Sequence, residues 1–457
     1  MVDLAVIGSG GAAMAAAIAA RQAGKSVVLV EQATLGGTCV NVGCVPSKTL
    51  LAAAGARHTA LSHPFAGVPT GAGPVDLGAL VGQKNELVER LRQAKYADVA
   101  AAYGFEVRPG RGRFTDWETL TVDGEPLPAG AYLVATGAEP DRPELPGLDE
   151  VNWLTSTSAI ELTELPESLV VIGGGYVGLE QAQLFAHLGA QVTLVGRLAP
   201  AAEPEIAGAL RRVFADDGIT VVEERGVAVE PGGGQVVVVT RGGHRVAGQQ
   251  LLVATGRRAR TDGLGLDLAG VATDERGFVR VDDEQRTTHP RIFAAGDVTG
   301  VPQFVYVAAA TGRAAALNAT GAAGPRPATV DYAGLPSVVF TRPQLASAGL
   351  TEAQATADGR RCDCRVLDLA DVPRALANRD TRGIVKLVAD AETGELLGVH
   401  AAAEGAGEIM LAATYAIKAQ MTVGEVADTW APYLTMAESL RIAAGLFRNE
   451  MPTSCCA

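Results

Sequence analysis

Two segments of the chain repeat one pattern: a short apolar strand, a glycine-rich turn, a helix and a second apolar strand. Residues 4–31 read LAVIGSGGAAMAAAIAARQAGKSVVLVE, and residues 169–197 read LVVIGGGYVGLEQAQLFAHLGAQVTLVGR. Parallel strands need a crossover of this length, and such units build parallel sheets that are covered by helices. The repetition therefore predicts an α/β fold with two nucleotide-binding units, which an internal duplication explains most simply.

The first turn has the spacing of a dinucleotide-binding fingerprint. Gly8 suits the tight turn, Gly10 lets the backbone reach a pyrophosphate, and the small Ala13 lets the helix pack on the strand. Glu31 ends the second strand, where its carboxylate can accept a hydrogen bond from a ribose hydroxyl. The complete order of strand, turn, helix, strand and acid favours a nucleotide site over a tight turn without a ligand.

The second turn repeats the glycine spacing at Gly173, Gly175 and Gly178. Its second strand ends at Arg197 and has no acid for a ribose 2′-hydroxyl, so the pattern favours NADPH, whose 2′-phosphate an arginine can bind. Tyr176 lies inside this turn. Its ring is expected either to cover an empty nicotinamide pocket or simply to pack, and the sequence leaves both readings open.

Two cysteines lie close together in GGTCVNVGCVPSK, residues 36–48, shortly after the first repeat. The glycines before Cys39 allow close backbone approach, and Lys48 places a positive charge one helical turn beyond Cys44. A nearby cation and a helix N-terminus both stabilise a thiolate. We therefore expect a disulfide that opens and closes, with a low pKa at Cys44, rather than two buried structural cysteines.

Two further strands end at the same tripeptide, Ala-Thr-Gly, and each of these strand ends is called an ATG stop below. The segments YLVATGAEP and LLVATGRRA bring Thr136, Gly137 and Gly256 to the ends of buried strands. The segment HPRIFAAGDVTG ends another short strand at Asp297, which is placed to bind the polyol chain of a flavin. The helix expected at 303–318 would then point its N-terminus at the flavin ring.

From about Tyr332 the pattern changes to strands followed by helices at 405–420 and 436–447, which predicts a separate α+β domain. Cys362 and Cys364 alternate along one of these strands, so their side chains point the same way. A metal site there is conceivable, but no further soft ligand lies nearby in the sequence, which favours structural thiols.

The chain ends in MPTSCCA, so Cys455 and Cys456 form an adjacent pair of thiols at a terminus. Such a pair suits binding of a thiophilic metal ion or electron transfer by disulfide exchange. Tyr96, in AKYADV, would by spacing alone be an ordinary half-buried tyrosine.

The composition excludes several classes of protein. The 457 residues carry a net charge of −13, which argues against a nucleic-acid partner and against an anionic membrane surface. Neither a membrane-spanning apolar run nor a signal peptide is recognisable, and the six cysteines fall in three close pairs. Paired cysteines in a reducing compartment usually serve redox or metal chemistry, so we expect a cytoplasmic protein.

The two fingerprints, the two ATG stops, the AAGD segment and the CVNVGC pair occur in the order found in the flavin-dependent pyridine nucleotide-disulfide oxidoreductases. The chain resembles this family over essentially its whole length, and its tail resembles the mercuric reductase branch. Tyr433 stands where disulfide reductases of the family carry the histidine that protonates a leaving thiolate, while Glu438 remains. None of the six histidines lies beyond His400. Unlike many relatives, the chain has no N-terminal CxxC metal-binding domain.

The resemblance implies a mechanism. NADPH reduces FAD, and FAD reduces the Cys39–Cys44 disulfide, with Cys44 against the flavin and Cys39 as the exchanging thiol. It also implies that Hg(II), or a Hg(II)–thiol complex, is collected by the Cys455–Cys456 pair of the other subunit of a homodimer. Hg(II) would then pass to the redox pair and be reduced to Hg(0).

Further residues take roles from the same resemblance. Tyr96 and Tyr433 would line the metal path, and Lys48, paired with Glu180, would support the charge on reduced flavin. The FAD-binding residues assigned are Gly8, Gly10, Ala13, Glu31, Gly37, Thr38, Lys48, Thr136, Gly137 and Asp297. The NADPH-binding residues assigned are Gly173, Gly175, Tyr176, Gly178, Glu180, Arg197 and Gly256.

The predicted fold is α/β, with two Rossmann-like dinucleotide-binding domains for FAD and NADPH and an α+β C-terminal dimerisation domain. The predicted domains are 1–150 and 259–330 for FAD, 151–258 for NADPH, and 331–457 for dimerisation with the cysteine tail. One alternative is an NADPH-dependent thiol–disulfide reductase that relays electrons through the tail cysteines, and the missing histidine weighs against it. Another is a metal-sequestering flavoprotein without catalysis, which leaves two nucleotide sites unexplained.

Overall fold

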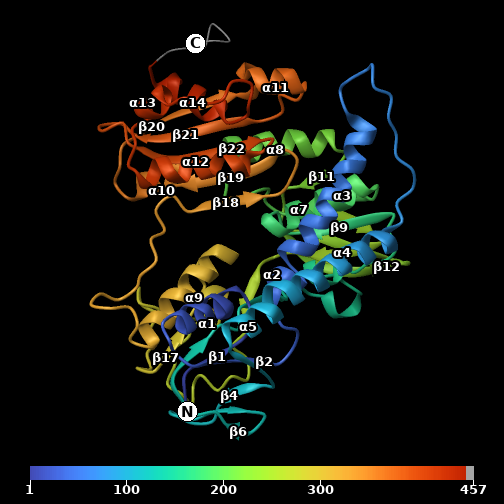
Figure 1. Cartoon of the computed structure of the whole chain (residues 1–457). Coiled ribbons are helices and arrows are strands. Elements are labelled where there is room, and N and C mark those ends of the chain that lie inside the picture. The colour runs from blue at the N-terminus through green and yellow to red at the C-terminus, as the bar shows by residue number, and fades with distance from the viewer. Residues whose placement is uncertain (449–457) are drawn as a thin grey trace. The chain divides into compact units, whose positions relative to one another are not determined.

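The computed structural model describes residues 1–448 (Figure 1). The chain divides into two compact units. Unit 1 comprises residues 1–50, 78–141 and 256–331, and unit 2 comprises residues 51–77, 142–255 and 332–457. The first fingerprint falls in unit 1, and the second falls in unit 2 together with the C-terminal segment. The finer division into FAD, NADPH and dimerisation domains stays a prediction.

Unit 1 is built on a five-stranded parallel sheet in the order β17-β7-β1-β2-β3. Its strands are β1 (Val2–Ile7), β2 (Val27–Glu31), β3 (Glu106–Pro109), β7 (Ala129–Val134) and β17 (Ile292–Ala294). Smaller sheets are formed by β4 (Gly112–Phe114), β5 (Leu120–Val122) and β6 (Glu125–Pro126), and by β8 (Ala138–Pro140) with β16 (Arg257–Ala259). The helical elements are α1 (Gly11–Gln22), α2 (Gly37–Asn41), α4 (Leu77–Arg92), a π-helix (Gln93–Ala97), α5 (Asp98–Tyr103), a 3₁₀ turn (Gly296–Thr299) and α9 (Val305–Ala319).

Helices α1 and α9 pack against each other very closely because small residues line their contact. A Cβ atom added at Gly312 of α9 would lie 2.1 Å from the carbonyl oxygen of Ala12 in α1. One face of the sheet packs on these alanine-rich helices, with Leu4, Leu29 and Leu133 buried between them. The alanine richness of α1 therefore serves close packing beneath the first glycine-rich turn.

Unit 2 contains a four-stranded parallel sheet in the order β11-β10-β9-β15. The elements of this part are a 3₁₀ turn (Leu148–Glu150), α6 (Ser156–Ala159), β9 (Ser168–Ile172), α7 (Tyr176–Leu188), β10 (Gln191–Val195), α8 (Pro204–Asp216), β11 (Thr220–Val222), β12 (Gly226–Gly232), β13 (Gln235–Thr240), β14 (Arg245–Gly248) and β15 (Gln250–Val253). Helix α3 (Cys44–Ser62) begins in unit 1, and its residues from Leu51 onward belong to unit 2.

The C-terminal segment of unit 2 is an antiparallel sheet in the order β18-β19-β22-β21-β20 with helices packed on it. Its elements are β18 (Pro336–Val339), β19 (Gln344–Gly349), α10 (Glu352–Ala357), β20 (Cys362–Asp368), a 3₁₀ turn (Leu369–Asp371), α11 (Pro373–Asn378), β21 (Ile384–Asp390), β22 (Leu396–Ala403), α12 (Ala406–Lys418), α13 (Val423–Asp428), α14 (Glu438–Gly445) and a 3₁₀ turn (Leu446–Arg448). The predicted α/β class with parallel sheets and a separate α+β segment is confirmed.

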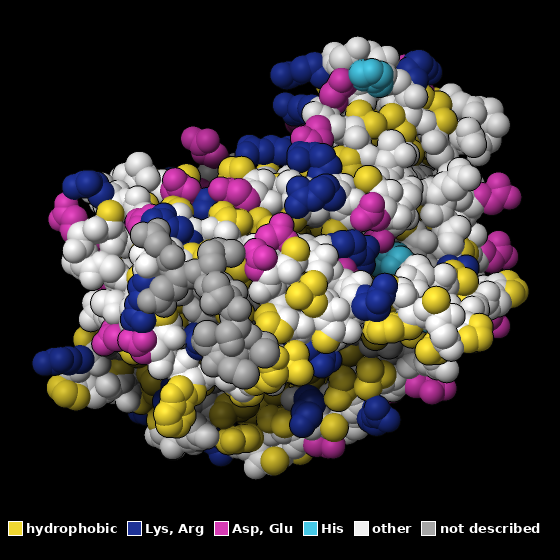
Figure 2. All heavy atoms as spheres, turned by 90° about the horizontal axis from the view of Figure 1, so that it is seen from above, with side chains coloured by type: hydrophobic (Ala, Val, Ile, Leu, Met, Phe, Trp, Pro, Cys, Tyr) yellow, Lys and Arg dark blue, Asp and Glu magenta, His cyan; other side chains and the backbone are white. Residues whose placement is uncertain are grey.

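The surface carries both signs of charge. On the face of the molecule shown in Figure 2, acidic and basic side chains are interspersed. The sequence has 51 acidic and 38 basic residues. Among residues 1–448, no helix is both long and apolar enough to cross a membrane.

Candidate functional site

The first glycine-rich turn is held in a conformation that only glycine tolerates. Gly8 has a φ of +113°, and a Cβ there would lie 2.4 Å from the carbonyl oxygen of Ala135. The amide of Gly8 donates to Val30 (2.8 Å), and the amide of Ala135 donates to Ile7 (2.9 Å). The turn is thus fixed against the start of the first ATG stop, at the carboxyl edge of the sheet, where ligands of such sheets bind.

The second turn reproduces this arrangement in unit 2. Gly173 has a φ of +111°, and a Cβ there would lie 2.3 Å from the carbonyl oxygen of Ala254, the first residue of the second ATG stop. A Cβ at Gly178 would come within 1.8 Å of the carbonyl oxygen of Gly173. The two turns are equivalent contact by contact, and each is followed by a helix whose N-terminus can bind a phosphate.

Ser9 and Glu31 connect the first turn to the cysteine segment. The hydroxyl of Ser9 donates to Oε2 of Glu31 (2.5 Å) and accepts a hydrogen bond from the amide of Gly36 (3.0 Å). The predicted ribose acid therefore lies beside the glycine-rich turn, as a nucleotide site requires. The glycine-lined cradle and this acid fit the adenosine half of FAD, which Gly8, Gly10, Ala13 and Glu31 would hold.

Asp297 lies half-buried in the 3₁₀ turn after β17, and desolvation raises the pKa of its carboxyl group while the charge of Arg257 opposes that shift. Burial in turn lowers the pKa of Arg257, whose guanidinium donates to the carbonyl of Ala138 (2.5 Å). Sequence reasoning proposed Asp297 but missed Arg257. The sequence could have indicated Arg257 as a site residue, because it directly follows the second ATG stop.

The cysteine segment packs on the first turn through glycine alone. Gly37 has a φ of +64°, and a Cβ there would lie 2.6 Å from the Cα of Gly10.

Gly37→Ala should therefore force the two segments apart and weaken retention of FAD by about tenfold or more, since 1.4 kcal/mol already corresponds to tenfold. The measurement is the flavin absorbance that stays with the protein after gel filtration.

Gly24→Ala provides the matched control for this change. Gly24 also has a left-handed φ, +77°, but a Cβ there meets nothing within 4 Å. Both variants share the backbone strain of about 1 kcal/mol, and only Gly37→Ala has the clash. Equal loss of flavin from both variants would show that the close approach of Gly37 to Gly10 does not shape the flavin site.

Cys39 lies in the short helix α2, and Cys44 is the first residue of α3. The hydrogen bond with Cys44, followed by burial, raises the pKa of the Cys39 thiol, and the charge of Lys48 acts in the opposite direction. The structure therefore brings the two predicted redox thiols into direct contact with a lysine nearby.

Tyr96 lies beside this thiol pair. Burial, followed by the charges of Cys39 and Cys44, raises the pKa of Tyr96 to about 12. The Cδ2 atom of its ring would lie 3.5 Å from a Cβ at Gly36. Tyr96 belongs to the π-helix between α4 and α5, and such single-turn insertions are frequent at functional sites. Spacing alone indicated an ordinary half-buried tyrosine at this position and did not reveal the π-helix.

Three predicted nicotinamide-site residues lie around the second turn. The hydroxyl of Tyr176 is 3.3 Å from the hydroxyl of Ser337. Arg197 is exposed just after β10, and Glu180 is buried in α7, where its Oε1 accepts a hydrogen bond from the amide of Phe340 (3.0 Å). The pairing of Glu180 with Lys48 stays a prediction, because these residues belong to different units.

Tyr433 is 52% exposed in the segment before α14. Glu438 is buried, and its Oε2 accepts a hydrogen bond from the amide of Leu434 (2.8 Å). The glutamate that would orient a histidine in a disulfide reductase is thus used to hold the backbone next to Tyr433. The predicted metal-collecting pair, Cys455 and Cys456, lies outside the described residues.

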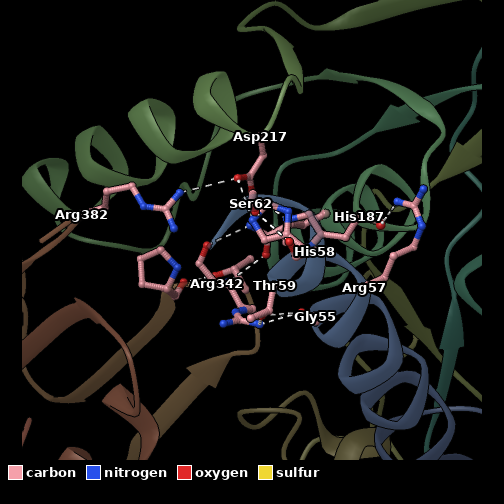
Figure 3. Close-up of polar contacts among 12 residues, drawn as sticks. Gly55, Arg57, His58, Thr59, Ser62, His187, Asp217, Arg342 and Arg382 are labelled. Carbon is pink, nitrogen blue, oxygen red and sulfur yellow. Dashed lines mark hydrogen bonds and ion pairs between the residues drawn. The ribbon is translucent and has the colours of Figure 1, made fainter. Parts of the chain in front are cut away.

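A second cluster of metal-binding residue types occurs in unit 2, where α3 meets α7 and the end of α8 (Figure 3). Asp217 accepts hydrogen bonds from His187 (2.9 Å) and from the side-chain amide of Gln183 (2.7 Å), and it lies 3.7 Å from the guanidinium of Arg382. The ring of His58 stacks on that of His187 with 3.8 Å between centroids. The carboxylate is already neutralised by cations and amide donors, so the cluster is built to fix α3 rather than to bind a metal ion.

This cluster makes the stability of the protein depend on pH. Burial, followed by the charge of His187, lowers the pKa of His58 to about 4. Between pH 6.5 and 4 the unfolded chain then binds the proton at this position and the folded chain does not, so stability falls as the pH falls. The free energy of unfolding should drop by about 1–2 kcal/mol across this window, which is less than the full shift corresponds to, because solvent screens this half-buried site.

Urea unfolding at pH 7 and at pH 4.5 measures this loss. His58→Gln should make the loss smaller, while His63→Gln, a change just beyond the end of α3, should leave it unchanged. A pH dependence that is identical in wild type and His58→Gln would contradict the assignment.

The sequence comparisons agree with this geometry. Residues 2–312 match the pyridine nucleotide-disulphide oxidoreductase family, and residues 335–444 match the dimerisation domain of that family. A mercuric reductase from Streptomyces lividans is 52% identical over 468 residues, which cover 100% of this chain and 98% of the relative. A mercuric reductase from Bacillus cereus is 47% identical, and the match covers 100% of this chain and 73% of the relative.

Solved structures show the same relationship. The HOCl-induced flavoprotein disulfide reductase RclA from Escherichia coli superimposes with a TM-score of 0.86 at 30% identity, covering 97% of this chain and 99% of RclA. LpdA from Mycobacterium tuberculosis has a TM-score of 0.85 at 29% identity, covering 98% of this chain and 100% of LpdA.

The chain therefore belongs to the pyridine nucleotide-disulphide oxidoreductase family, and it is an oxidoreductase of the kind that uses a flavin and a pyridine nucleotide. Within that family, its similarity to mercuric reductases extends over the full chain, so the predicted resemblance to that branch is confirmed.

Proposed function

We propose that the enzyme reduces Hg(II) to Hg(0) with NADPH. The observation that carries this proposal is the contact between Cys39 and Cys44 in a segment fixed directly on the first nucleotide turn, close enough to Tyr96 for their charges to raise its pKa. Two adjacent sulfurs suit Hg(II), which is soft and prefers thiolate ligands. The full-length similarity to mercuric reductases supports the same substrate.

Gly8, Gly10, Ala13 and Glu31 would hold FAD, which would supply the transfer of two electrons from the nicotinamide to the Cys39–Cys44 pair. Cys39 and Cys44 then hold Hg(II) between them and exchange it with incoming thiolates one sulfur at a time. The raised pKa of Cys39 opposes the loss of its proton, and the charge of Lys48, which acts in the opposite direction, would help Cys39 to exchange as a thiolate. One NADPH supplies the two electrons that open the Cys39–Cys44 disulfide, and each further NADPH would supply, by way of the flavin, the two electrons that reduce one bound Hg(II) to Hg(0).

The preference for NADPH over NADH rests on Arg197. It is exposed just beyond β10, where an acid would otherwise bind the 2′-hydroxyl of NADH. Tyr176, at the start of α7, would cover the nicotinamide pocket and move when the ring enters.

The segment around Tyr433 favours a metal substrate over a disulfide. A leaving thiolate needs a proton donor, and this position offers a tyrosine, while Glu438 is engaged by the backbone of Leu434. A mercury atom that leaves in neutral form needs no proton. A thiol–disulfide reductase is therefore the less favoured candidate.

We propose a homodimer in which Cys455 and Cys456 of one subunit deliver Hg(II) to the redox pair of the other, since residues 335–444 match a dimerisation domain. Replacing both tail cysteines with alanine should slow turnover of thiol-complexed Hg(II) by about tenfold or more, because delivery from a tethered site is then lost. Steady-state NADPH oxidation with Hg(II) and excess cysteine measures this effect. An unchanged rate would remove the tail from the pathway.

The experiment that tests the function is NADPH oxidation by the flavin-loaded enzyme with Hg(II) in excess thiol, together with detection of volatile mercury. A cytoplasmic location is proposed with it, because cysteines that fall in close pairs, as they do in this sequence, stay reduced only in a reducing compartment.

A further inference from the structure

Cys362 and Cys364 lie on β20, the edge strand of the C-terminal sheet. In the ladder with β21, Cys362 pairs with Asp390 and Cys364 pairs with Val388. Residues two apart on a strand point to the same face, and both cysteines are free and half-buried. The redox mechanism proposed above makes no use of this pair.

The spacing of the two cysteines decides what they can do. A strand rises about 3.4 Å per residue, so their Cβ atoms lie about 6.8 Å apart. A disulfide requires Cβ atoms about 3.5–4.5 Å apart, and it is therefore excluded while the strand stays regular. A metal ion bound linearly by two thiolates, with metal–sulfur bonds of about 2.3 Å as for zinc, separates the sulfurs by about 4.6 Å. The two Cβ–S bonds span the remaining distance.

We propose that Cys362 and Cys364 form a second metal-binding site, which takes one soft, thiophilic ion such as Hg(II) as a bridge between the two sulfurs. The site is independent of the reduction proposed above, since its sulfurs bind the ion without transferring electrons to it.

The surroundings of the pair suit such an ion. Both cysteines pack against an apolar cluster formed by Ala355, Val388 and Leu397. The side chains of this apolar cluster carry no oxygen or nitrogen atoms, so on the inner side only the two sulfurs can act as ligands. A hard cation such as Ca²⁺, which needs six or more oxygen ligands, would therefore bind poorly here. The carboxylate of Glu352 accepts hydrogen bonds from Lys386 (2.8 Å) and from the thiol of Cys364, and burial, followed by the charge of Glu352, raises the pKa of Cys364 to about 12. An incoming ion therefore has to displace this thiol proton. The half-exposed thiols remain open to an incoming ion on the outer side.

Loading is a ligand exchange without a redox step. A Hg(II) ion that carries two small thiolates exchanges the first for the sulfur of one cysteine and the second for the sulfur of the other. Each cysteine loses its proton to the thiolate that leaves, so two small thiols are released and mercury stays in the +2 state. Because the second exchange is intramolecular, the pair competes well against single thiols.

The test uses the flavin-loaded full chain with Cys39, Cys44, Cys455 and Cys456 replaced by serine, so that only the β20 pair can bind. Hg(II) is added with excess cysteine, free metal is removed by gel filtration, and bound mercury is measured by mass spectrometry. We expect about one equivalent per chain, with two sulfur neighbours in the X-ray absorption spectrum. The absence of retained mercury would overturn the proposal.

A spacing variant separates a bridged site from two ordinary thiols. Cys364→Ser combined with Val366→Cys keeps two thiols on the same face of β20 but doubles their separation, and Val366 is exposed, so the strand tolerates the change. The amount of mercury retained should fall at least tenfold in this variant and in Cys364→Ser alone. Both variants should keep the circular dichroism spectrum of the parent protein, which shows that the fold is intact. Equal retention by the spacing variant would show that the thiols bind singly, which contradicts the proposal.

Discussion

Replacing Cys44 with alanine should reduce mercury-dependent NADPH oxidation by about 10³-fold or more, the range expected when a reacting nucleophile is removed. Cys44 begins α3 and contacts Cys39, so alanine leaves a single sulfur that can neither form the disulfide nor complete the two-sulfur site. Steady-state absorbance at the nicotinamide band measures the loss.

The control for this variant is Thr49→Ala, on the same helix. The hydroxyl of Thr49 bonds only to the carbonyl of Val45 (2.8 Å), so its removal should leave turnover within a factor of about two. Both variants should retain flavin to the same extent. A Cys44→Ala enzyme that turns over Hg(II) at the rate of wild type would disprove the role of the redox pair.

Asp217→Ala should destabilise the protein by about 3–5 kcal/mol, the cost of removing one partner from a buried charge cluster. The side chain of Asp217 is 2% exposed, and its loss leaves the donors of His187 and Gln183 without their acceptor. The guanidinium of Arg382 also loses this carboxylate (Figure 3). Urea unfolding at pH 7 gives the difference in the free energy of unfolding.

Asp216→Ala is the matched control, because Asp216 is the preceding residue and is exposed. Its replacement should change the free energy of unfolding by less than about 0.5 kcal/mol. Comparable losses in the two variants would mean that net charge, rather than the buried cluster, stabilises this part of unit 2.

Local patterns predicted the parts of the fold that short-range geometry controls. Gly8 and Gly173 could be placed in tight turns because their spacing from the flanking strands leaves few alternatives. The contact of Cys39 with Cys44 follows from a separation of five positions across one loop.

Contacts over long distances in the sequence were not predictable in this way. His58 lies on α3, His187 on α7 and Asp217 directly after α8, and nothing in the local pattern around any one of them indicates the other two. The π-helix at Tyr96 escaped prediction because a single inserted residue leaves the helical periodicity almost unchanged. Arg257 was missed because an arginine after a strand is usually exposed, whereas here it is half-buried and its charge acts on Asp297.

One comparison of substrates tests the central claim most directly. The purified flavin-loaded enzyme is given NADPH and either Hg(II) with excess thiol, oxidised lipoamide, oxidised glutathione or oxidised thioredoxin, while volatile mercury is collected. The proposed function predicts NADPH oxidation with Hg(II), release of one mercury atom for each NADPH consumed, and little oxidation with the disulfides. Oxidation with a disulfide and none with Hg(II) would contradict it and identify a disulfide reductase that works without the family's histidine.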